Sequence, residues 1–315
     1  MRGKSLWLAA LYHSTGPTFT MQQDERSGLL LALSGFALLS VGDAIIKTMA
    51  GQWSPLAVAA LRFAIGAAAL SALLLVTEGP SAFRPRKPWL QVARGACLAG
   101  ATLCFFSAIF VMPLADAMAI AFVSPIFVAL FSGPLLGEKV RPGVWLVSLV
   151  ALGGVALILR PNLAELGIVA LLPLASAFFF ALMVVANRSS AGQGSALSMQ
   201  AFIALWATPF LIIAALIGDR SSLASLEIGT PDWTVVARCA LVAVTASAAH
   251  WIAYLGTMRA GASTIAPTTY VQIIVATTLG YLVFGDVPDT PTLAGAAIVV
   301  GAGLFLWWST PRRAK

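Results

Sequence analysis

Charged residues are scarce in this chain of 315 residues, since Asp, Glu, Lys and Arg together make up 10% of it. Soluble domains carry about 25% charged residues. A hydrophobic share of 59% leaves too few polar side chains to cover a surface in water, and the mean hydropathy of +0.92 agrees. The composition therefore excludes a soluble globular protein and is typical of a chain that crosses a membrane many times.

Histidine, cysteine and catalytic motifs are scarce as well. The sequence has two histidines, and its three cysteines lie in apolar runs without the spacing of metal ligands or of a disulfide framework. It contains no G-x-S-x-G, no H-E-x-x-H and no Walker-type glycine loop. We therefore expect no metal site, no cofactor and no enzymatic activity.

Long apolar runs are what the chain has in abundance. A bilayer core about 30 Å thick needs about 20 helical residues, and ten runs approach that length. We expect an all-α integral membrane protein with ten transmembrane helices, at residues 29–50, 54–76, 91–112, 114–136, 143–159, 167–187, 197–217, 235–257, 262–284 and 291–309.

The net charge of +7 does not indicate nucleic acid, because the basic residues flank the apolar runs. With the N-terminus inside, most of them fall on the inner side, and only Arg160 and Arg220 fall on the outer side. The positive-inside rule then places both termini in the cytoplasm. The expected location is a bacterial-type inner membrane. Residues 1–27 are expected to form a disordered cytoplasmic tail, with Met21 as an alternative start, and residues 311–315 a second cytoplasmic tail.

The two halves of the chain repeat a pattern. Residues 133–138 (GPLLGE) correspond to residues 280–286 (GYLVFGD), and each is followed by a proline-containing loop and a glycine-rich run. Residues 28–160 and 167–310 therefore look like two copies of five helices. Because five is odd, the copies enter the membrane in opposite senses, as an inverted repeat. The alternative is unrelated halves that both use small residues for close helix packing.

Charges within the apolar runs are the first candidates for a site, because each costs about 2.5–3.5 kcal/mol at mid-bilayer. Asp43 is the only acid expected well inside a run, and Lys47 lies one turn later on the same face. Arg62 should reach a similar depth. We expect Lys47 and Arg62 to anchor a substrate carboxylate and Asp43 to be a proton-coupling group. A structural ion pair with a snorkelling Lys47 is the alternative.

His250 is the second coupling candidate, because imidazole titrates near neutral pH. Trp251 and Tyr254 lie beside it and one turn further on, so the three are predicted to line a cavity suited to a flat or cationic substrate. The alternative is a histidine buried in the core.

Prolines in the middle of two runs predict broken or hinged helices whose freed carbonyls face a cavity. Pro125 follows Ser124 in the fourth run, and Pro267 precedes Tyr270 and Gln272 in the ninth. Ser124, Tyr270 and Gln272 are therefore substrate-binding candidates.

Three polar residues near the ends of runs are interpreted as structural. Arg94 and Arg238 begin the third and eighth runs, where a lipid headgroup anchor is expected. Asn187 is expected to cap the sixth helix.

Several segments resemble a known family. Residues 112–127 (MPLADAMAIAFVSPIF), ending at Gly137 and Glu138, resemble the first-repeat signature of the drug/metabolite transporter superfamily, EamA type. Residues 42–47 (GDAIIK) and 61–63 (LRF) are similar to it too. The resemblance implies ten helices, an inverted repeat, a central substrate cavity and no ATP hydrolysis. Residue 286 is Asp where the family usually has Glu.

The expected function is secondary active transport of a small metabolite by alternating access. The expected partners are that small molecule, membrane lipids and a coupling proton, and no nucleic acid. An amino-acid-like or otherwise anionic substrate is favoured, and export is favoured slightly over import. The alternatives are a metabolite or vitamin importer of the same fold, a membrane enzyme that acts on lipid headgroups, and a passive channel.

Overall fold

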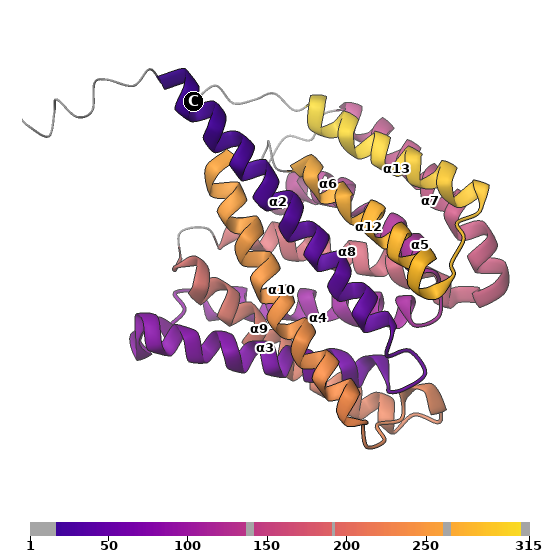
Figure 1. Cartoon of the computed structure of the whole chain (residues 1–315), viewed down its shortest axis with the longest axis horizontal. Helices are drawn as coiled ribbons and strands as arrows, with labels where there is room; N and C mark the ends of the chain where they lie inside the picture. Colours follow the sequence, from indigo (N-terminus) through magenta and orange to yellow (C-terminus); the bar gives the residue numbers. More distant parts are fainter. Residues whose placement is uncertain (1–16, 137–141, 191–192, 261–265, 310–315) are drawn as a thin grey trace, which may run out of the picture.

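The protein is helical throughout the residues that its computed structural model describes, which are 17–136, 142–190, 193–260 and 266–309, and no strand occurs in them (Figure 1). Seven helices of this part are long and apolar enough to cross a membrane. Helices form because lipid offers no partner to free backbone groups. Three shorter apolar helices accompany the seven, at Trp145–Arg160, Thr268–Phe284 and Thr290–Phe305.

The first half begins with a helix longer than expected. Helix α2 (Pro17–Lys47) includes residues 17–27, which belong to the segment expected as a cytoplasmic tail. Proline suits the first helical position, and no glycine or further proline interrupts residues 18–27. The other helices of this half are α3 (Pro55–Glu78), α4 (Pro88–Ile109), α5 (Leu114–Ala121), α6 (Ser124–Leu136) and α7 (Pro142–Leu166).

The second half repeats a similar order of elements. A short 3-10 helix, η2 (Gly167–Leu171), leads directly into its first long helix. Its last two runs are joined by a short loop after a π-helical turn, η5 (Gly280–Phe284). The remaining elements are α8 (Leu172–Ser189), α9 (Ala196–Asp219), α10 (Trp233–Ala260), η4 (Ala266–Tyr270), α12 (Val271–Leu279) and α13 (Thr290–Ser309).

Helices of one half pack mainly on helices of the other. The main pairs are α2 with α10, α3 with α9, α4 with both α8 and α9, and α7 with α13. Glycines allow the closest approaches. A Cβ at Gly35 would lie 2.7 Å from the Ala249 carbonyl oxygen, and one at Gly154 would lie 2.9 Å from that of Gly295. Close backbone contact at small residues is the usual packing of membrane helices.

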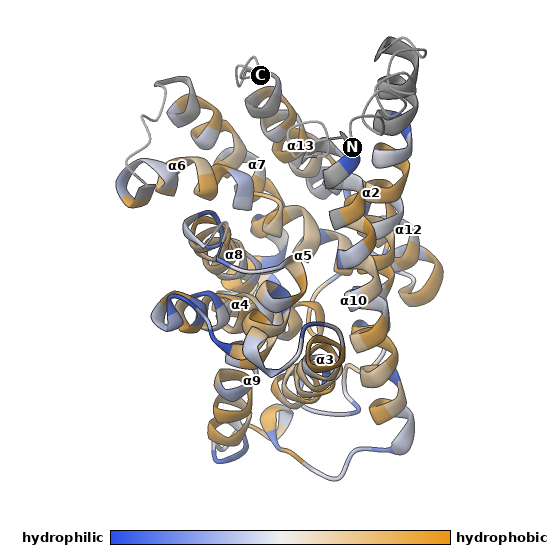
Figure 2. Ribbon diagram, turned by 90° about the vertical axis from the view of Figure 1, so that its left-hand side faces the viewer, coloured by the Kyte–Doolittle hydropathy of each residue, from blue (hydrophilic) through white to orange (hydrophobic). Residues whose placement is uncertain are grey.

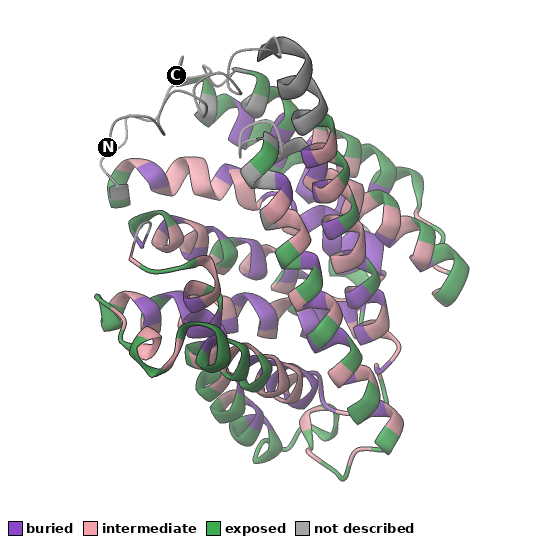
Figure 3. Ribbon diagram, turned by 60° about the vertical axis from the view of Figure 1, so that its left-hand side comes forward, coloured by how far each residue is buried: buried purple, intermediate pink, exposed green. Residues whose placement is uncertain are grey.

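The outer surface of the helices is apolar. Hydrophobic residues follow the helices, and polar residues concentrate at their ends and in the loops (Figure 2). Exposed residues recur along several helices (Figure 3). Many of them are large and apolar, among them Val76 at 84% and Ile168 at 80%. A surface of this kind matches lipid rather than water.

The fourth and ninth runs are interrupted. Helix α5 ends at Ala121 and α6 begins at Ser124, so Phe122 and Val123 separate two helices. The ninth run passes from the 3-10 helix η4 to α12 and then to the π-helical turn η5. Irregular backbone at this depth is tolerated where it is buried in protein or lines a cavity. Both interruptions border the site described next.

Candidate functional site

A cavity of about 760 Å³ lies among α2, α3, α4, α8, α9 and α10 and is completed by the interrupted fourth and ninth runs. Its volume falls within the range of about 300–1,000 Å³ that is typical of small-molecule sites. Most of its lining is apolar and aromatic, and a few polar groups converge on it. The cavity is therefore the candidate binding site.

Asp43 on α2 and Arg62 on α3 line this cavity. The Arg62 guanidinium lies 4.8 Å from the centre of the Phe63 ring and 5.6 Å from that of Phe106. Across residues 17–136, 142–190, 193–260 and 266–309, neither Asp43 nor Arg62 makes a hydrogen bond or an ion pair. Both charged groups therefore keep their hydrogen-bonding capacity for a ligand.

His250 on α10 also lines the cavity. Its Nδ1 lies 2.7 Å from the carbonyl oxygen of Ala246. Because a carbonyl only accepts, Nδ1 carries the proton that it donates, and Nε2 of the neutral ring is left as an acceptor. The neighbouring Trp251 is a lining residue as well.

The interrupted runs contribute Ser124, Pro125 and Gln272 to the lining. The Ser40 hydroxyl donates to the backbone carbonyl of Gln272 at 3.0 Å and fixes α12 against α2. Tyr270 does not line the cavity and instead packs on Phe122, with ring centres 5.4 Å apart.

Two predicted site residues have side chains outside the described part. The backbone of Tyr254 lies in α10, and that of Pro267 lies in η4.

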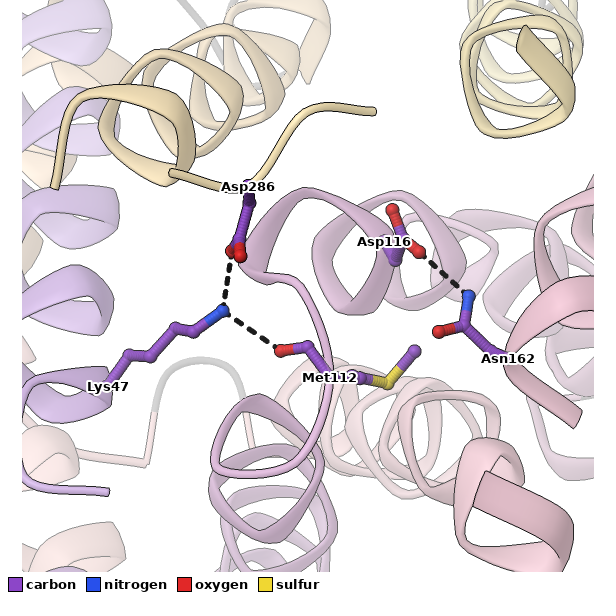
Figure 4. Close-up of polar contacts among 5 residues, drawn as sticks. All are labelled: Lys47, Met112, Asp116, Asn162 and Asp286. Atoms are coloured by element: carbon purple, nitrogen blue, oxygen red, sulfur yellow. Dashed lines mark hydrogen bonds and ion pairs between the residues drawn. The ribbon is translucent and has the colours of Figure 1, made fainter. Parts of the chain in front are cut away.

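Lys47 lies outside the cavity. Its Nζ is 2.7 Å from Asp286 Oδ2 and donates to the Met112 carbonyl oxygen at 3.0 Å (Figure 4). The side chains of Lys47 and Asp286 are 12% and 22% exposed. Gly285 has a left-handed φ of 71°, and this turn places Asp286 beside the end of α2. The expected cluster of three charges is thus divided, with Asp43 and Arg62 in the cavity and Lys47 in this contact.

A second buried acid was missed by the sequence analysis. Asp116 on α5 is 6% exposed and accepts a hydrogen bond of 2.7 Å from Asn162 Nδ2 on α7 (Figure 4). Asp43 is therefore not the only acid within the helices. Asp116 stands near the start of its run, so the sequence indicated a helix end at the membrane surface rather than a buried position.

Arg94 is not at a lipid headgroup position, which corrects the expectation for it. The residue is 4% exposed and lines the cavity. Its Nε donates to Asn187 Oδ1 at 2.5 Å, and its Nη1 donates to Gln91 Oε1. Asn187 is thus an acceptor for Arg94 and a lining residue.

Arg238 differs from Arg94 by lying outside the cavity lining. Its Nη1 donates to the backbone carbonyl of Thr48 at 3.0 Å, and its Nη2 donates to Gln52 Oε1 at 2.5 Å. Like Arg94, it ties the start of one helix to the end of another. Its neutral partners match those of Arg94 in kind.

Comparisons with known proteins agree with this arrangement. The EamA-like transporter family model matches residues 26–160. The pseudopaline exporter CntI of Pseudomonas aeruginosa is 30% identical, over 89% of this chain and 96% of that protein. The S-adenosylmethionine uptake transporter of Rickettsia prowazekii is 24% identical, over 90% and 93%. The riboflavin transporter of Vibrio cholerae is 28% identical, over 68% and 69%.

A solved crystal structure of another protein shares the fold. It is 24% identical in sequence, has a TM-score of 0.58, and is matched over 89% of this chain and 96% of that one.

Apolar helices around a cavity with a few converging charges are the architecture of a membrane protein that binds a small molecule, and the family and the relatives' names point to a transporter. The chain belongs to the EamA-like transporter family, within the drug/metabolite transporter superfamily. The resemblance seen in the sequence is thereby confirmed. The names of the relatives also favour transport over the alternative of a lipid-modifying enzyme.

Proposed function

We propose that this protein is a secondary active transporter that carries a small amino-acid-like or anionic metabolite across the bacterial inner membrane. The observation that carries the proposal is the pair of opposite charges, Asp43 and Arg62, which line one cavity and have no hydrogen-bonded or ion-paired partner among the described residues. A charge in a low-dielectric cavity is costly unless something pairs with it. A substrate carboxylate on Arg62 and a substrate ammonium or a proton on Asp43 would supply the pairing.

The proposed architecture is ten spans in two inverted five-helix repeats, with both termini in the cytoplasm. The packing supports it, because exchanging the repeats preserves the helix pairs. Helix α2 packs on α10 as α8 packs on α4, while α3–α9 and α7–α13 pair equivalent helices. Gly154 and Gly295 occupy equivalent places, since each would bring a Cβ against the other's carbonyl oxygen.

Alternating access requires that one end of the cavity close while the other opens. The contact of Lys47 with Asp286 and Met112 joins α2, the loop after η5 and the turn between α4 and α5. We assign this contact as the latch of the outer end, and we assign Asp43 and His250 as the coupling groups. The proposed direction is export, as in the 30% identical relative.

The proposal is tested with purified protein in liposomes loaded with a bacterial metabolite extract. We expect one or a few compounds to leave liposomes that hold the wild type and to stay in liposomes that hold Arg62→Gln. The matched control is Arg220→Gln, because Arg220 is exposed at the end of α9 and the change is chemically the same. Loss of no compound with the wild type, or equal loss with Arg62→Gln, would reject the proposal.

A further inference from the structure

Arg94 is a buried cation that has no counter-ion among the residues that the structure describes. It is 4% exposed and lines the cavity, yet its hydrogen-bond partners are the side-chain oxygens of Asn187 and Gln91 and the Met199 carbonyl. All three are neutral. Neutral acceptors orient a guanidinium but leave its charge uncompensated, and burial of an uncompensated charge is expensive.

A second unsatisfied group lies beside this cation. The Gln91 side chain is 1% exposed, and its Nε2 has no hydrogen-bond partner within the described part of the chain. Because Gln91 Oε1 accepts from Arg94, the amide orientation is fixed and Nε2 is the donor that remains. A buried donor without a partner costs about 1–3 kcal/mol. Gln91 is not among the residues that line the cavity, so Arg94 is the group of this pair that a ligand can reach.

Arg94 lies far from Arg62 along the cavity. Arg94 and Phe106 are both on α4 (Pro88–Ile109), and their separation corresponds to about 18 Å of helix at about 1.5 Å per residue. The Arg62 guanidinium is 5.6 Å from the Phe106 ring. The two guanidinium groups therefore lie toward opposite ends of α4. Aromatic residues, including Phe105 and Phe180, line the cavity with them.

The cavity also carries more positive than negative charge. Within the described ranges the cavity is lined by two arginines, Arg62 and Arg94, and by one acid, Asp43, and His250 adds no negative charge. A substrate with one carboxylate and one ammonium would pair Arg62 and Asp43 and leave Arg94 unmatched. A second carboxylate on the substrate would give Arg94 its counter-charge.

We propose that Arg94 is a specificity-determining residue that binds a second acidic group of the substrate. This inference rests on the proposed function and narrows its substrate class. The preferred substrate is an elongated amphoteric acid, with an amino-acid head between Asp43 and Arg62, an apolar middle, and an acidic group at Arg94.

The experiment measures binding of two probes of equal length to the purified protein by calorimetry. One is 2-aminodecanedioic acid, and the other, 2-aminodecanoic acid, lacks only the second carboxylate. We expect the wild type to bind the diacid at least about tenfold more tightly, a difference of about 1.4 kcal/mol. Arg94→Gln should remove this preference, because its affinity for the diacid should fall about tenfold more than its affinity for the monoacid.

Arg238→Gln is the matched control, because Arg238 makes the same kind of neutral contacts without lining the cavity. Arg238→Gln should keep the preference for the diacid. Arg94→Lys should keep part of this preference, because lysine retains the positive charge.

Equal affinity of the wild type for both probes overturns the inference without any variant, so it stays testable if Arg94→Gln does not fold. Equal loss of both probes in Arg94→Gln also overturns it and indicates a structural contact. Lack of binding by either probe rejects the amino-acid head site together with the second-acid site. Transport of monoacids in the liposome assay, without diacid preference, leaves the proposed function standing and rejects this inference alone.

Discussion

Asp43 differs from the other acids among the helices in what contacts its carboxylate. Asp286 has the ammonium of Lys47, and Asp116 has the amide of Asn162 (Figure 4). Asp43 has no bonded partner in the ranges that the structure covers. Of these three carboxylates, Asp43 alone lines the cavity without a bonded partner among the described residues, which leaves it available to a proton or to a substrate ammonium.

We therefore expect Asp43→Asn to separate transport from the pH gradient. The amide cannot take up a proton, so a pH gradient should no longer accelerate uptake or release, while substrate exchange at equal pH persists at about one tenth of the wild-type rate, a change of about 1.4 kcal/mol. The measurement compares liposomes with and without a pH gradient. The control is Asp219→Asn, at the exposed end of α9. An unchanged response to the gradient would remove Asp43 from coupling.

The sequence predicted site residues correctly where a polar or charged side chain stands inside an apolar run. Asp43, Arg62 and His250 stood out as polar residues deep in apolar runs, and the structure places all three in the cavity lining. The position of Lys47 was not predictable, because its partner Asp286 is distant in sequence and reaches it through the turn at Gly285. Arg94 was assigned to a lipid headgroup position because it lies near the start of a helix. The sequence does not show that neighbouring helices bury it there.

At the scale of elements, α4 and α9 are held together where Gly95 faces the backbone of α9. A Cβ at Gly95 would lie 2.6 Å from the Trp206 carbonyl carbon and 2.8 Å from the Ala207 nitrogen. These are backbone atoms, which cannot rotate away. The close pairing of the two helices therefore depends on glycine at this position.

Gly95→Ala is expected to destabilise the protein by about 1–3 kcal/mol, the usual cost of overpacking. The matched control is Gly153→Ala, because a Cβ there meets nothing within 4 Å. Thermal unfolding in detergent measures both variants, and only Gly95→Ala should have a lowered melting temperature. Equal melting temperatures of Gly95→Ala and Gly153→Ala would mean that the stability of the protein does not depend on the close contact of α4 with α9 at Gly95.

The proposed latch is the contact of Lys47 on α2 with Asp286 in the loop after η5. Its role in transport can be tested by substitution. Lys47→Met leaves Asp286 partly buried without its cation, and loss of one partner of a buried pair costs about 3–5 kcal/mol. We expect the transport rate to fall at least about tenfold. The double variant with Lys47→Asp and Asp286→Lys should recover part of the rate, because it restores opposite charges.

Rates of the single and double variants in liposomes, with amounts of inserted protein measured, check this expectation. A double variant no faster than Lys47→Met would show that charge pairing is not what matters at these positions.

For the whole molecule, the number of helices that cross the membrane determines whether the two halves have opposite orientations. The sequence predicted ten spans, and seven helices in the described ranges meet the length and hydropathy of a span. The fifth run illustrates the difference, because its apolar part, Trp145–Arg160, is short, whereas α7 as a helix extends over Pro142–Leu166. Its 25 residues correspond to about 37 Å at about 1.5 Å each, enough to cross.

The sides of the membrane on which two loops lie distinguish ten spans from seven. Between Arg86, before α4, and Ser222, after α9, five helical runs cross if α7 is a span, and four cross if only the seven long helices do. Five crossings place these loops on opposite sides of the membrane, and four place them on the same side. The basic residues Arg84, Arg86 and Lys87 favour the cytoplasmic side for the first loop.

We expect a cysteine at Ser222 to react with a membrane-impermeant maleimide in intact spheroplasts at least about tenfold faster than a cysteine at Arg86. Each is introduced alone, with Cys97, Cys104 and Cys239 replaced by alanine, and both should react once the cells are permeabilised. Both residues are exposed, so access through the membrane is the only difference expected. Equal reaction in intact cells would place α7 outside the set of spans and break the inverted repeat, because one copy would then have four crossings and no opposite orientation.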